Sequence, residues 1–383
     1  MSELEEYRKE IDAIDAQLVS LYEQRMAMSE KVASFKIQEG KRVLDSEREK
    51  KKLAAVEQLA HGDFNRTGVR ELFEQIMAMS RKKQYQMITE NGGLNRLPFI
   101  ETDSIASAGS RVVYQGAPGS YSEAAMKQFF GKDTAGIPVA TFRDAMTAIE
   151  EGAGDFAVLP IENSTAGVVS ENYDLLEEYE NYIVGEQIIP IRHCLMAAEG
   201  ATEESIERVY SHAQSLMQCE KFLAAHPQWE QISMKNNAFA AQKVAQDGSP
   251  AEAAIASEYA AEAYGLHILE RGVNQSAENS TRFIICTNQK IFPKNADKIS
   301  IIVEISHESG SLYHVLSHFI YNDLNMTKIE SRPIEGRNWE YRFFIDFEGN
   351  LEDSGVRNAL RGLRDETRKL KILGNYARSQ DVL

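Results

Sequence analysis

The chain has few cysteines, no long apolar run and no excess of basic residues, and each absence excludes a class of protein. Its three cysteines, Cys194, Cys219 and Cys286, lack the spacing of metal ligands, which predicts reduced core thiols in a cytoplasmic protein. No apolar run near the N-terminus has the length of a signal peptide or a membrane span. A formal net charge of −16 opposes binding to nucleic acids and anionic membranes. The 383 residues suffice for about two or three domains.

A regular series of apolar residues predicts that the chain begins with one long helix packed along a continuous seam. Arg25 takes the seam position between Leu21 and Met28. A buried guanidinium must be paired or must bind an anion, because burying it alone costs several kcal/mol. The apolar series comprises Leu4, Tyr7, Ile11, Ile14, Leu18, Leu21, Met28, Val32 and Phe35.

Two interpretations of Arg25 remain open on the first helix alone. It is either a register-setting residue paired with a buried glutamate or one wall of a cationic pocket. Lys36 lies about three helical turns further along and close to the same face. Together the two cations suit a small polyanion held inside a helical bundle.

Two further helices are predicted before residue 90, and polar residues complete their apolar faces. Asp45 is placed to cap the second helix, and Arg48 and Glu49 follow one turn later on the same face. The third helix carries an apolar stripe that Ser80 and Gln84 continue at helical spacing. Polar residues thus finish the stripes of several helices, which favours a ligand cavity.

Arg8 precedes Arg25 by roughly 25 Å along the helix axis, at about 1.5 Å per residue, so only a symmetric dimer would bring both to one small molecule. Residues 4–88 resemble the all-helical chorismate mutase family, a swapped dimer with two pockets. The resemblance implies a substrate-binding set of Arg8 from the other protomer, Arg25, Lys36, Asp45, Arg48, Glu49, Ser80 and Gln84.

The chemistry of that family fits this set of residues. The rearrangement of chorismate to prephenate is unimolecular and needs no nucleophile, metal or proton transfer. It is helped by clamping two carboxylates and by donors to the ether oxygen, which gains negative charge as its C–O bond lengthens. The resemblance implies that the arginines hold the carboxylates, Lys36 and Gln84 serve the ether oxygen catalytically, and Glu49 holds the hydroxyl.

After the helical domain of residues 1–90, the composition of residues 91–110 indicates a linker rich in Gly, Ser and Ala. Strand-like runs then alternate with amphipathic helices over residues 111–290, the pattern of an α/β domain. The predicted strands are 111–114, 156–161, 183–189, 209–211, 253–257 and 282–287.

Polar segments at the ends of predicted strands indicate a site in this second domain. They are residues 116–122, 160–167, 211–218 and 279–283. Glycines let the backbone approach a ligand, and helix-start N–H groups favour an anion. Each segment alone is more often a turn or a helix cap, but together they are typical of a site at the carboxyl ends of strands.

Residues 111–287 resemble prephenate dehydratase, with two α/β lobes built like a periplasmic binding protein and the ligand in the cleft. The matching motifs are 116–122, Glu162-Asn163, 211–218 and Thr281-Arg282-Phe283; Ala213 stands where the family usually has proline. The resemblance implies that Glu162, Asn163, Ser211 and Gln218 surround the ligand.

Decarboxylative dehydration needs a proton for the leaving hydroxyl and a loose grip on the departing ring carboxylate, since a strong salt bridge there would stabilise the ground state. The resemblance assigns the proton to Thr281, as donor or as conduit. Arg282 is either the anchor of the other carboxylate or a structural ion pair, and the sequence leaves both open.

Residues 298–377 have the strand and helix order βαββαβ, which is a ferredoxin-like α+β arrangement. The module resembles the ACT regulatory domain, which implies phenylalanine binding at a dimer interface by Gly310, Leu312, Glu330, Ser331 and Arg332. Ser311 and Tyr313 depart from the family pattern. A dimerisation module without a ligand is the alternative.

These resemblances predict a multidomain, cytoplasmic chorismate mutase and prephenate dehydratase without cofactor or metal. Its expected ligands are chorismate, prephenate and the feedback effector phenylalanine, and it is expected to form a homodimer or a higher homo-oligomer. The rival function is a non-catalytic amino-acid sensor with a relict helical arm. The polar set around Arg25 argues against a relict, because a leucine there would be more stable.

Overall fold

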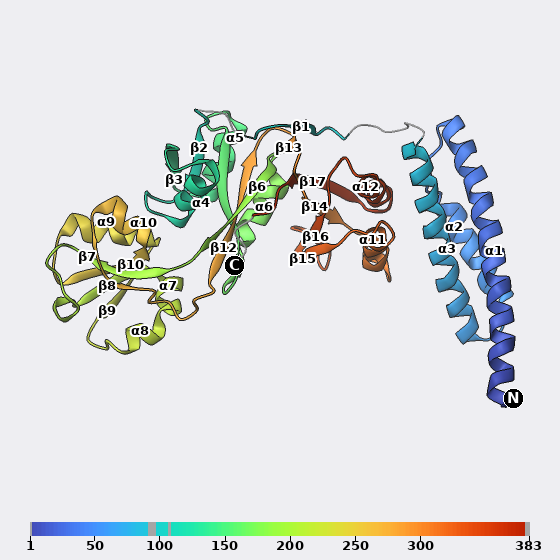
Figure 1. The fold of residues 1–383 in the computed structure, drawn as a ribbon, viewed down its shortest axis with the longest axis horizontal. Coiled ribbons are helices and arrows are strands. Elements are labelled where there is room, and N and C mark those ends of the chain that lie inside the picture. The colour runs from blue at the N-terminus through green and yellow to red at the C-terminus, as the bar shows by residue number, and fades with distance from the viewer. Residues whose placement is uncertain (1, 91–96, 106–108, 380–383) are drawn as a thin grey trace. The chain divides into compact units, whose positions relative to one another are not determined.

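The computed structural model describes residues 2–90, 97–105 and 109–379 (Figure 1). They belong to two compact units. The first unit contains Met1–Leu97 and Ile301–Lys371, and the second contains Pro98–Ser300 and Ile372–Leu383. No helix among the described residues is long and apolar enough to cross a membrane. The three cysteines are buried and free, as predicted.

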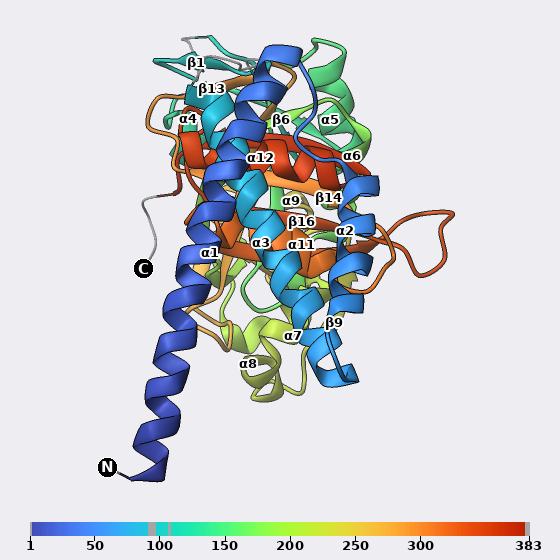
Figure 2. The same ribbon diagram turned by 90° about the vertical axis from the view of Figure 1, so that its right-hand side faces the viewer.

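The first unit begins with the three predicted helices, α1 (Glu3–Glu39), α2 (Ser46–Leu59) and α3 (Asp63–Glu90) (Figure 2). Helix α1 ends at Gly40, whose φ of 63° is the left-handed conformation that glycine adopts most readily. Helix α2 begins where the Asp45 side chain accepts a hydrogen bond from the Arg48 N–H at 3.0 Å. Helix α3 packs against both of the others.

The apolar series of α1 is exposed in the chain instead of lying in a packed seam, with relative exposures from 46% at Val32 to 61% at Leu21. The buried residues of α1 are Ser29 and Ala33, which lie on a neighbouring face. The contacts to α3 from Arg25, Ser29 and Glu30 all come from the second half of α1. The predicted long helix is therefore confirmed, but its apolar seam is not buried against other described parts of the same chain.

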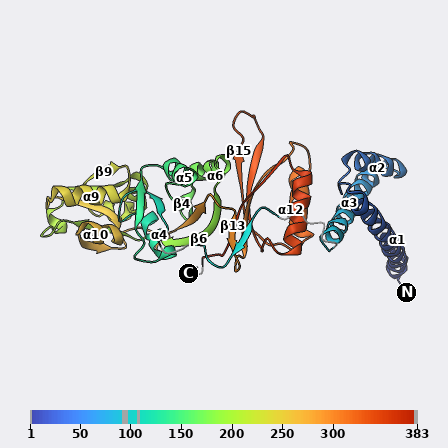
Figure 3. The ribbon, with the colours of Figure 1, turned by 90° about the horizontal axis from the view of Figure 1, so that it is seen from above.

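The first unit also contains most of the predicted βαββαβ module (Figure 3). Its elements are β14 (Lys298–Glu304), α11 (Ser311–Ile320), β15 (Met326–Pro333), β16 (Tyr341–Glu348), α12 (Ser354–Glu366) and β17 (Lys369–Tyr376). The strand order is β15-β16-β14-β17, so β15 forms an edge. Helix α12 buries Val356, Leu360 and Leu363, one face at helical spacing. The predicted order of elements is present.

The second unit has two α/β lobes. The first lobe has the strand order β6-β12-β4-β2-β3 and a core that includes Met126, Val158 and Phe283. Its elements are β2 (Val112–Gln115), α4 (Tyr121–Phe130), β3 (Gly136–Val139), α5 (Phe142–Glu150), β4 (Phe156–Asn163), β5 (Gly167–Val168), α6 (Ser170–Glu178), β6 (Tyr182–Pro190) and β12 (Ser280–Thr287).

The second lobe has the strand order β11-β7-β10-β8-β9. Its elements are β7 (His193–Ala197), β8 (Arg208–His212), α7 (Ala213–Gln218), α8 (Glu220–Ala224), β9 (Glu230–Met234), α9 (Asn237–Asp247), β10 (Glu252–Ser257), α10 (Glu258–Tyr264) and β11 (His267–Arg271). The chain enters this lobe after β6 and leaves it before β12, so both crossings lead from neighbouring strands of the first lobe.

The predicted linker is partly structured. Residues 91–96 and 106–108 lie outside the described residues, but Ile100–Thr102 form the strand β1. This strand pairs in parallel with β13 (Ile291–Pro293), so backbone hydrogen bonding fixes a stretch that its composition indicated to be a linker.

Candidate active sites

A cavity of about 820 Å³ lies among the three N-terminal helices. It brings together every residue of the predicted mutase set except Arg8, namely Arg25, Lys36, Asp45, Arg48, Glu49, Ser80 and Gln84. Arg8 lies on the exposed N-terminal part of α1, as the helical rise requires.

Arg25 does not form the glutamate pair that was the alternative interpretation. Its Nη1 donates to Ser80 Oγ at 2.7 Å and to the Ile76 carbonyl at 3.4 Å. Partial burial lowers the pKa of Arg25, although the Glu49 carboxylate raises it. An arginine side chain stays protonated near neutral pH. Arg25 is therefore a half-buried cation that lines the cavity and donates hydrogen bonds to neutral groups.

Lys36 is also half-buried beside the cavity, where its ammonium donates to the Val43 carbonyl. Burial lowers the pKa of Lys36, and the carboxylates of Asp45 and Glu49 partly offset this effect. The amide oxygen of Gln84 is buried without a hydrogen-bond partner among the described residues. The cavity therefore offers cationic and amide groups to a polar ligand.

Arg81 is a cavity residue that the sequence interpretation missed. It is 7% exposed, and its Nη1 donates to Glu49 Oε2 at 2.5 Å. Its Nη2 forms an ion pair with Glu366 of α12 at 2.9 Å. Burial lowers the pKa of Arg81, but Glu366 and Glu49 more than offset this, so the pKa is raised. The position of Arg81 next to Ser80 in the sequence could have indicated that it lies near the cavity.

In the second unit, Thr281 lines a cavity of about 200 Å³ between the two lobes. The cavity lies where α4 and α9 begin, and their capping residues Ser120 and Asn236 both line it. Helix N-termini favour anions. Asn236 Nδ2 is a buried donor without a hydrogen-bond partner among the described residues, which also suits an anionic ligand. Asn236 was not predicted from the sequence.

A chain of hydrogen bonds leads from one lobe to Thr281 in the other. Gln218 Nε2 donates to Thr165 Oγ1 at 3.1 Å, and Thr165 Oγ1 donates to Asn163 Oδ1 at 2.8 Å. Asn163 Nδ2 then donates to Thr281 Oγ1 at 2.9 Å. Because the Thr281 oxygen accepts this bond, its own proton is directed toward another acceptor. Three predicted residues are thus brought together.

Gln218 also contacts His193, which was not predicted. Gln218 Oε1 lies 3.1 Å from His193 Nε2, and Tyr121 OH lies 3.2 Å from His193 Nδ1. Burial lowers the pKa of His193 to about 4, so the ring is neutral near pH 7. His193 therefore orients Gln218 as a neutral hydrogen-bonding group.

Ser211 lies beneath the site and is fully buried. Its hydroxyl donates to the Ile255 carbonyl at 2.6 Å and lies 3.0 Å from Asn237 Oδ1. Asn237 lines the cavity beside Asn236. Ser211 is therefore placed to support Asn237. The sequence had predicted that Ser211 contacts the ligand directly.

Arg282 forms a buried ion pair of the kind that was one of the two roles left open by the sequence. It follows Thr281 on β12, and side chains that are adjacent in a strand point to opposite faces. Its Nε donates to Glu186 Oε2 at 2.7 Å. Glu162 pairs with Arg282 in the register of β4 and β12, so it shares the face of Arg282 and not that of Thr281. The strand register therefore places neither Arg282 nor Glu162 on the face of Thr281.

A third cavity, of about 400 Å³, lies at the start of α11 in the ferredoxin-like module. Gly310 and Leu312 line it, and the φ of 83° at Gly310 favours glycine. Glu330, Ser331 and Arg332 lie on the edge strand β15 and do not line this cavity. Within one chain, the residues predicted to bind the effector therefore lie in two separate places, the cavity at the start of α11 and the edge strand β15.

Comparison with known proteins agrees with the division into two enzymatic domains. Residues 7–85 match the family Chorismate mutase type II, and residues 112–291 match the family Prephenate dehydratase. These matches define a chain that joins a mutase to a dehydratase.

Two bifunctional relatives have both parts in one chain. A bifunctional chorismate mutase/prephenate dehydratase of Aquifex aeolicus is 32% identical, with 99% of each chain covered. That of Escherichia coli K12 is also 32% identical, covering 96% of this chain and 95% of the relative. A prephenate dehydratase of Arthrobacter aurescens solved in complex with L-Phe is 30% identical, with a TM-score of 0.66 over 71% of this chain and 91% of its own.

The chain belongs to the family of bifunctional chorismate mutase/prephenate dehydratases. It is an enzyme of phenylalanine biosynthesis that rearranges chorismate to prephenate and converts prephenate to phenylpyruvate. The alternative of a non-catalytic sensor is thereby excluded.

Proposed function

We propose that the cavity beside Arg25 is the mutase site and that it clamps chorismate by charge. Arg25 and Arg48 hold the two carboxylates, Lys36 and Gln84 donate to the ether oxygen, and Glu49 holds the hydroxyl. The observation that carries this assignment is Arg25 itself, a half-buried cation whose side-chain partner is the neutral Ser80. Mutase kinetics of Arg25→Leu test it, and a near-normal rate would contradict it.

The mutase site is completed by a second copy of the chain. The exposed apolar series of α1 supports this, because a stripe of that length needs a partner helix. The second copy would add Arg8, which its own chain leaves far from the cavity. Sedimentation at equilibrium tests the dimer, and a monomer at micromolar concentration would contradict it.

For the dehydratase, Thr281 passes a proton to the leaving hydroxyl of prephenate. Asn163 supports this role because its amide holds the Thr281 oxygen as an acceptor. The starts of α4 and α9, with Asn236, receive the carboxylate that is retained. Thr281→Ser should keep far more dehydratase turnover than Thr281→Val. Equal loss in both variants, with both folded, would make Thr281 a packing residue.

The ferredoxin-like module is an ACT domain that binds phenylalanine as a feedback effector. The cavity at Gly310 and Leu312 suits an amino-acid carboxylate at the start of α11. Glu330, Ser331 and Arg332 complete the site from the edge strand of a second copy. Calorimetric titration with phenylalanine tests this, with tyrosine as the control; no heat with either would favour a dimerisation module without a ligand. The buried free cysteines also support a cytoplasmic location.

A further inference from the structure

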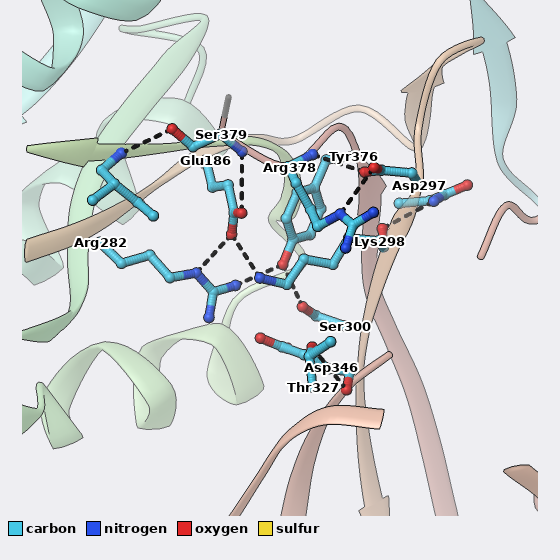
Figure 4. Close-up of polar contacts among 12 residues, drawn as sticks. Glu186, Arg282, Asp297, Lys298, Ser300, Thr327, Asp346, Tyr376, Arg378 and Ser379 are labelled. Atoms are coloured by element: carbon cyan, nitrogen blue, oxygen red, sulfur yellow. Dashed lines mark hydrogen bonds and ion pairs between the residues drawn. The ribbon is translucent and has the colours of Figure 1, made fainter. Parts of the chain in front are cut away.

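A buried cluster of polar side chains surrounds Arg282 of β12 (Figure 4). It lies on the face opposite Thr281, because adjacent side chains of a strand point to opposite faces. Arg282 Nε donates to Glu186 Oε2 at 2.7 Å, and Lys298 Nζ donates to the same oxygen at 2.9 Å. Arg282 Nη2 donates to Tyr376 OH at 2.8 Å. Glu186 comes from β6, Lys298 from β14 and Tyr376 from β17. One cluster therefore joins β12 to β6 and to Lys298 and Tyr376, all within the second compact unit.

Glu186 is the centre of this cluster. Its side chain is 4% exposed, against 13% for Arg282 and 10% for Lys298. Its other oxygen, Oε1, accepts a hydrogen bond from the Ser379 N–H at 3.2 Å. Charges buried to this degree need their partners, because breaking one pair leaves an uncompensated charge. The guanidinium of Arg282 is thus committed to protein partners.

The same strand carries the cluster on one face and the dehydratase site on the other. Thr281 and Arg282 are adjacent, and the register places Thr281 opposite Asn163 of β4. The pairing of β12 with β4 is irregular directly after Arg282. A register shift of this kind disrupts the ladder locally and bends the strand. The buried ion pair of Arg282 on the other face therefore helps to set where the Thr281 backbone lies.

We propose that Arg282 is a positioning residue of the dehydratase, which acts through its buried ion pair with Glu186 and does not bind the substrate. Through this pair, the strand of Thr281 is tied to Lys298 and Tyr376, which belong to the same compact unit. This inference rests on the proposed role of Thr281.

The test is a double-mutant cycle in the full-length chain with Arg282→Met, Glu186→Gln and the combination. Each single variant should lower the dehydratase kcat by about 10- to 100-fold, because a misplacement of about 1 Å can cost that much. The KM for prephenate should change by less than about 3-fold, and the double variant should be no slower than the slower single variant. Arg282→Lys, which keeps the charge, should recover part of the rate.

Two controls separate positioning from general destabilisation. Arg143→Met removes an exposed ion pair with Glu178 in the same lobe and should leave kcat unchanged. The mutase rate of each variant, measured on the same preparation below its melting temperature, should remain normal.

Four results would overturn the inference. If Arg282→Met raises the KM strongly while Glu186→Gln is normal, Arg282 is a substrate anchor. If both variants melt earlier but keep kcat, the pair only stabilises the fold. If Thr281→Val keeps the full dehydratase rate, the proposed role of Thr281 fails and the inference fails with it. Inactive Thr281→Val beside fully active Glu186→Gln overturns the inference alone.

Discussion

Replacing Arg25 by leucine should abolish the mutase activity without unfolding the protein. The guanidinium donates to Ser80 Oγ at 2.7 Å and lines the mutase cavity. Losing one such preorganised donor typically costs about 100- to 1000-fold in kcat, or roughly 2.7–4 kcal/mol of transition-state stabilisation. We expect a loss at the upper end of this range, because the group is charged and the substrate is an anion.

The same substitution should cost little folding stability. Ser80 Oγ keeps its hydrogen bond to the Ile76 carbonyl at 2.9 Å and its contact with Ser29 Oγ at 3.1 Å, so no buried polar group loses all its partners. Leucine also avoids the desolvation that lowers the pKa of Arg25. The net change in unfolding free energy should stay within about 1 kcal/mol.

The assay follows chorismate consumption and the melting temperature of Arg25→Leu, with Arg70→Leu as the matched control. Arg70 lies on α3 in exposed ion pairs with Glu57 and Glu74, and its loss should leave mutase turnover normal. Dehydratase turnover on added prephenate should be normal in both variants. Mutase activity within about 5-fold of wild type in folded Arg25→Leu would refute the assignment of the cavity.

Three further predictions concern the same two sites. Arg81→Met should lower the mutase kcat roughly 10-fold, because Glu49 loses a partner at 2.5 Å. In a double-mutant cycle, Glu49→Gln should lower kcat less in the Arg81→Met chain than in the wild type. Arg8→Ala and Arg25→Ala chains, each inactive, should regain about a quarter of wild-type mutase activity when co-refolded, since half the dimers then have one intact pocket of two; heterodimers without activity would contradict the shared site. The pKa of His193 falls from an ordinary 6.5 to about 4 on folding, so between these pH values the unfolded chain binds more protons than the folded chain. The free energy of unfolding should therefore decrease as the pH drops from about 6.5 to 4. In urea unfolding, His193→Asn should depend less steeply on pH in this range, and an unchanged dependence would exclude His193 as its cause.

The gathering of residues around the N-terminal cavity could be predicted from helical spacing. Periodicity places Arg25 and Lys36 on one side of α1 and Ser80 and Gln84 on one side of α3, and the cavity contains all four. Arg81 was missed because it is one position off that stripe, where helical geometry favours solvent. Its partner Glu366 is far along the chain, and no local pattern links the two.

In the dehydratase domain, the sequence motifs indicated where the strands lie, but not which face of the sheet each side chain occupies. Alternation along β12 already implied that Thr281 and Arg282 point in opposite directions. Glu186, the buried partner of Arg282, comes from another strand and is recognised only once the sheet is assembled. Asn236 was missed because a helix cap is locally complete, and only packing of the lobes turns it into a cavity wall.

The most direct test of the central claim is a time course of chorismate consumption by the Thr281→Val chain, with prephenate and phenylpyruvate followed separately. Two chemistries at separate sites predict that chorismate disappears at the wild-type rate, prephenate accumulates and phenylpyruvate does not form. Mutations at distant sites without shared partners act independently. Phenylpyruvate forming at the normal rate would contradict the role of Thr281, and slow loss of chorismate would contradict the independence of the two sites.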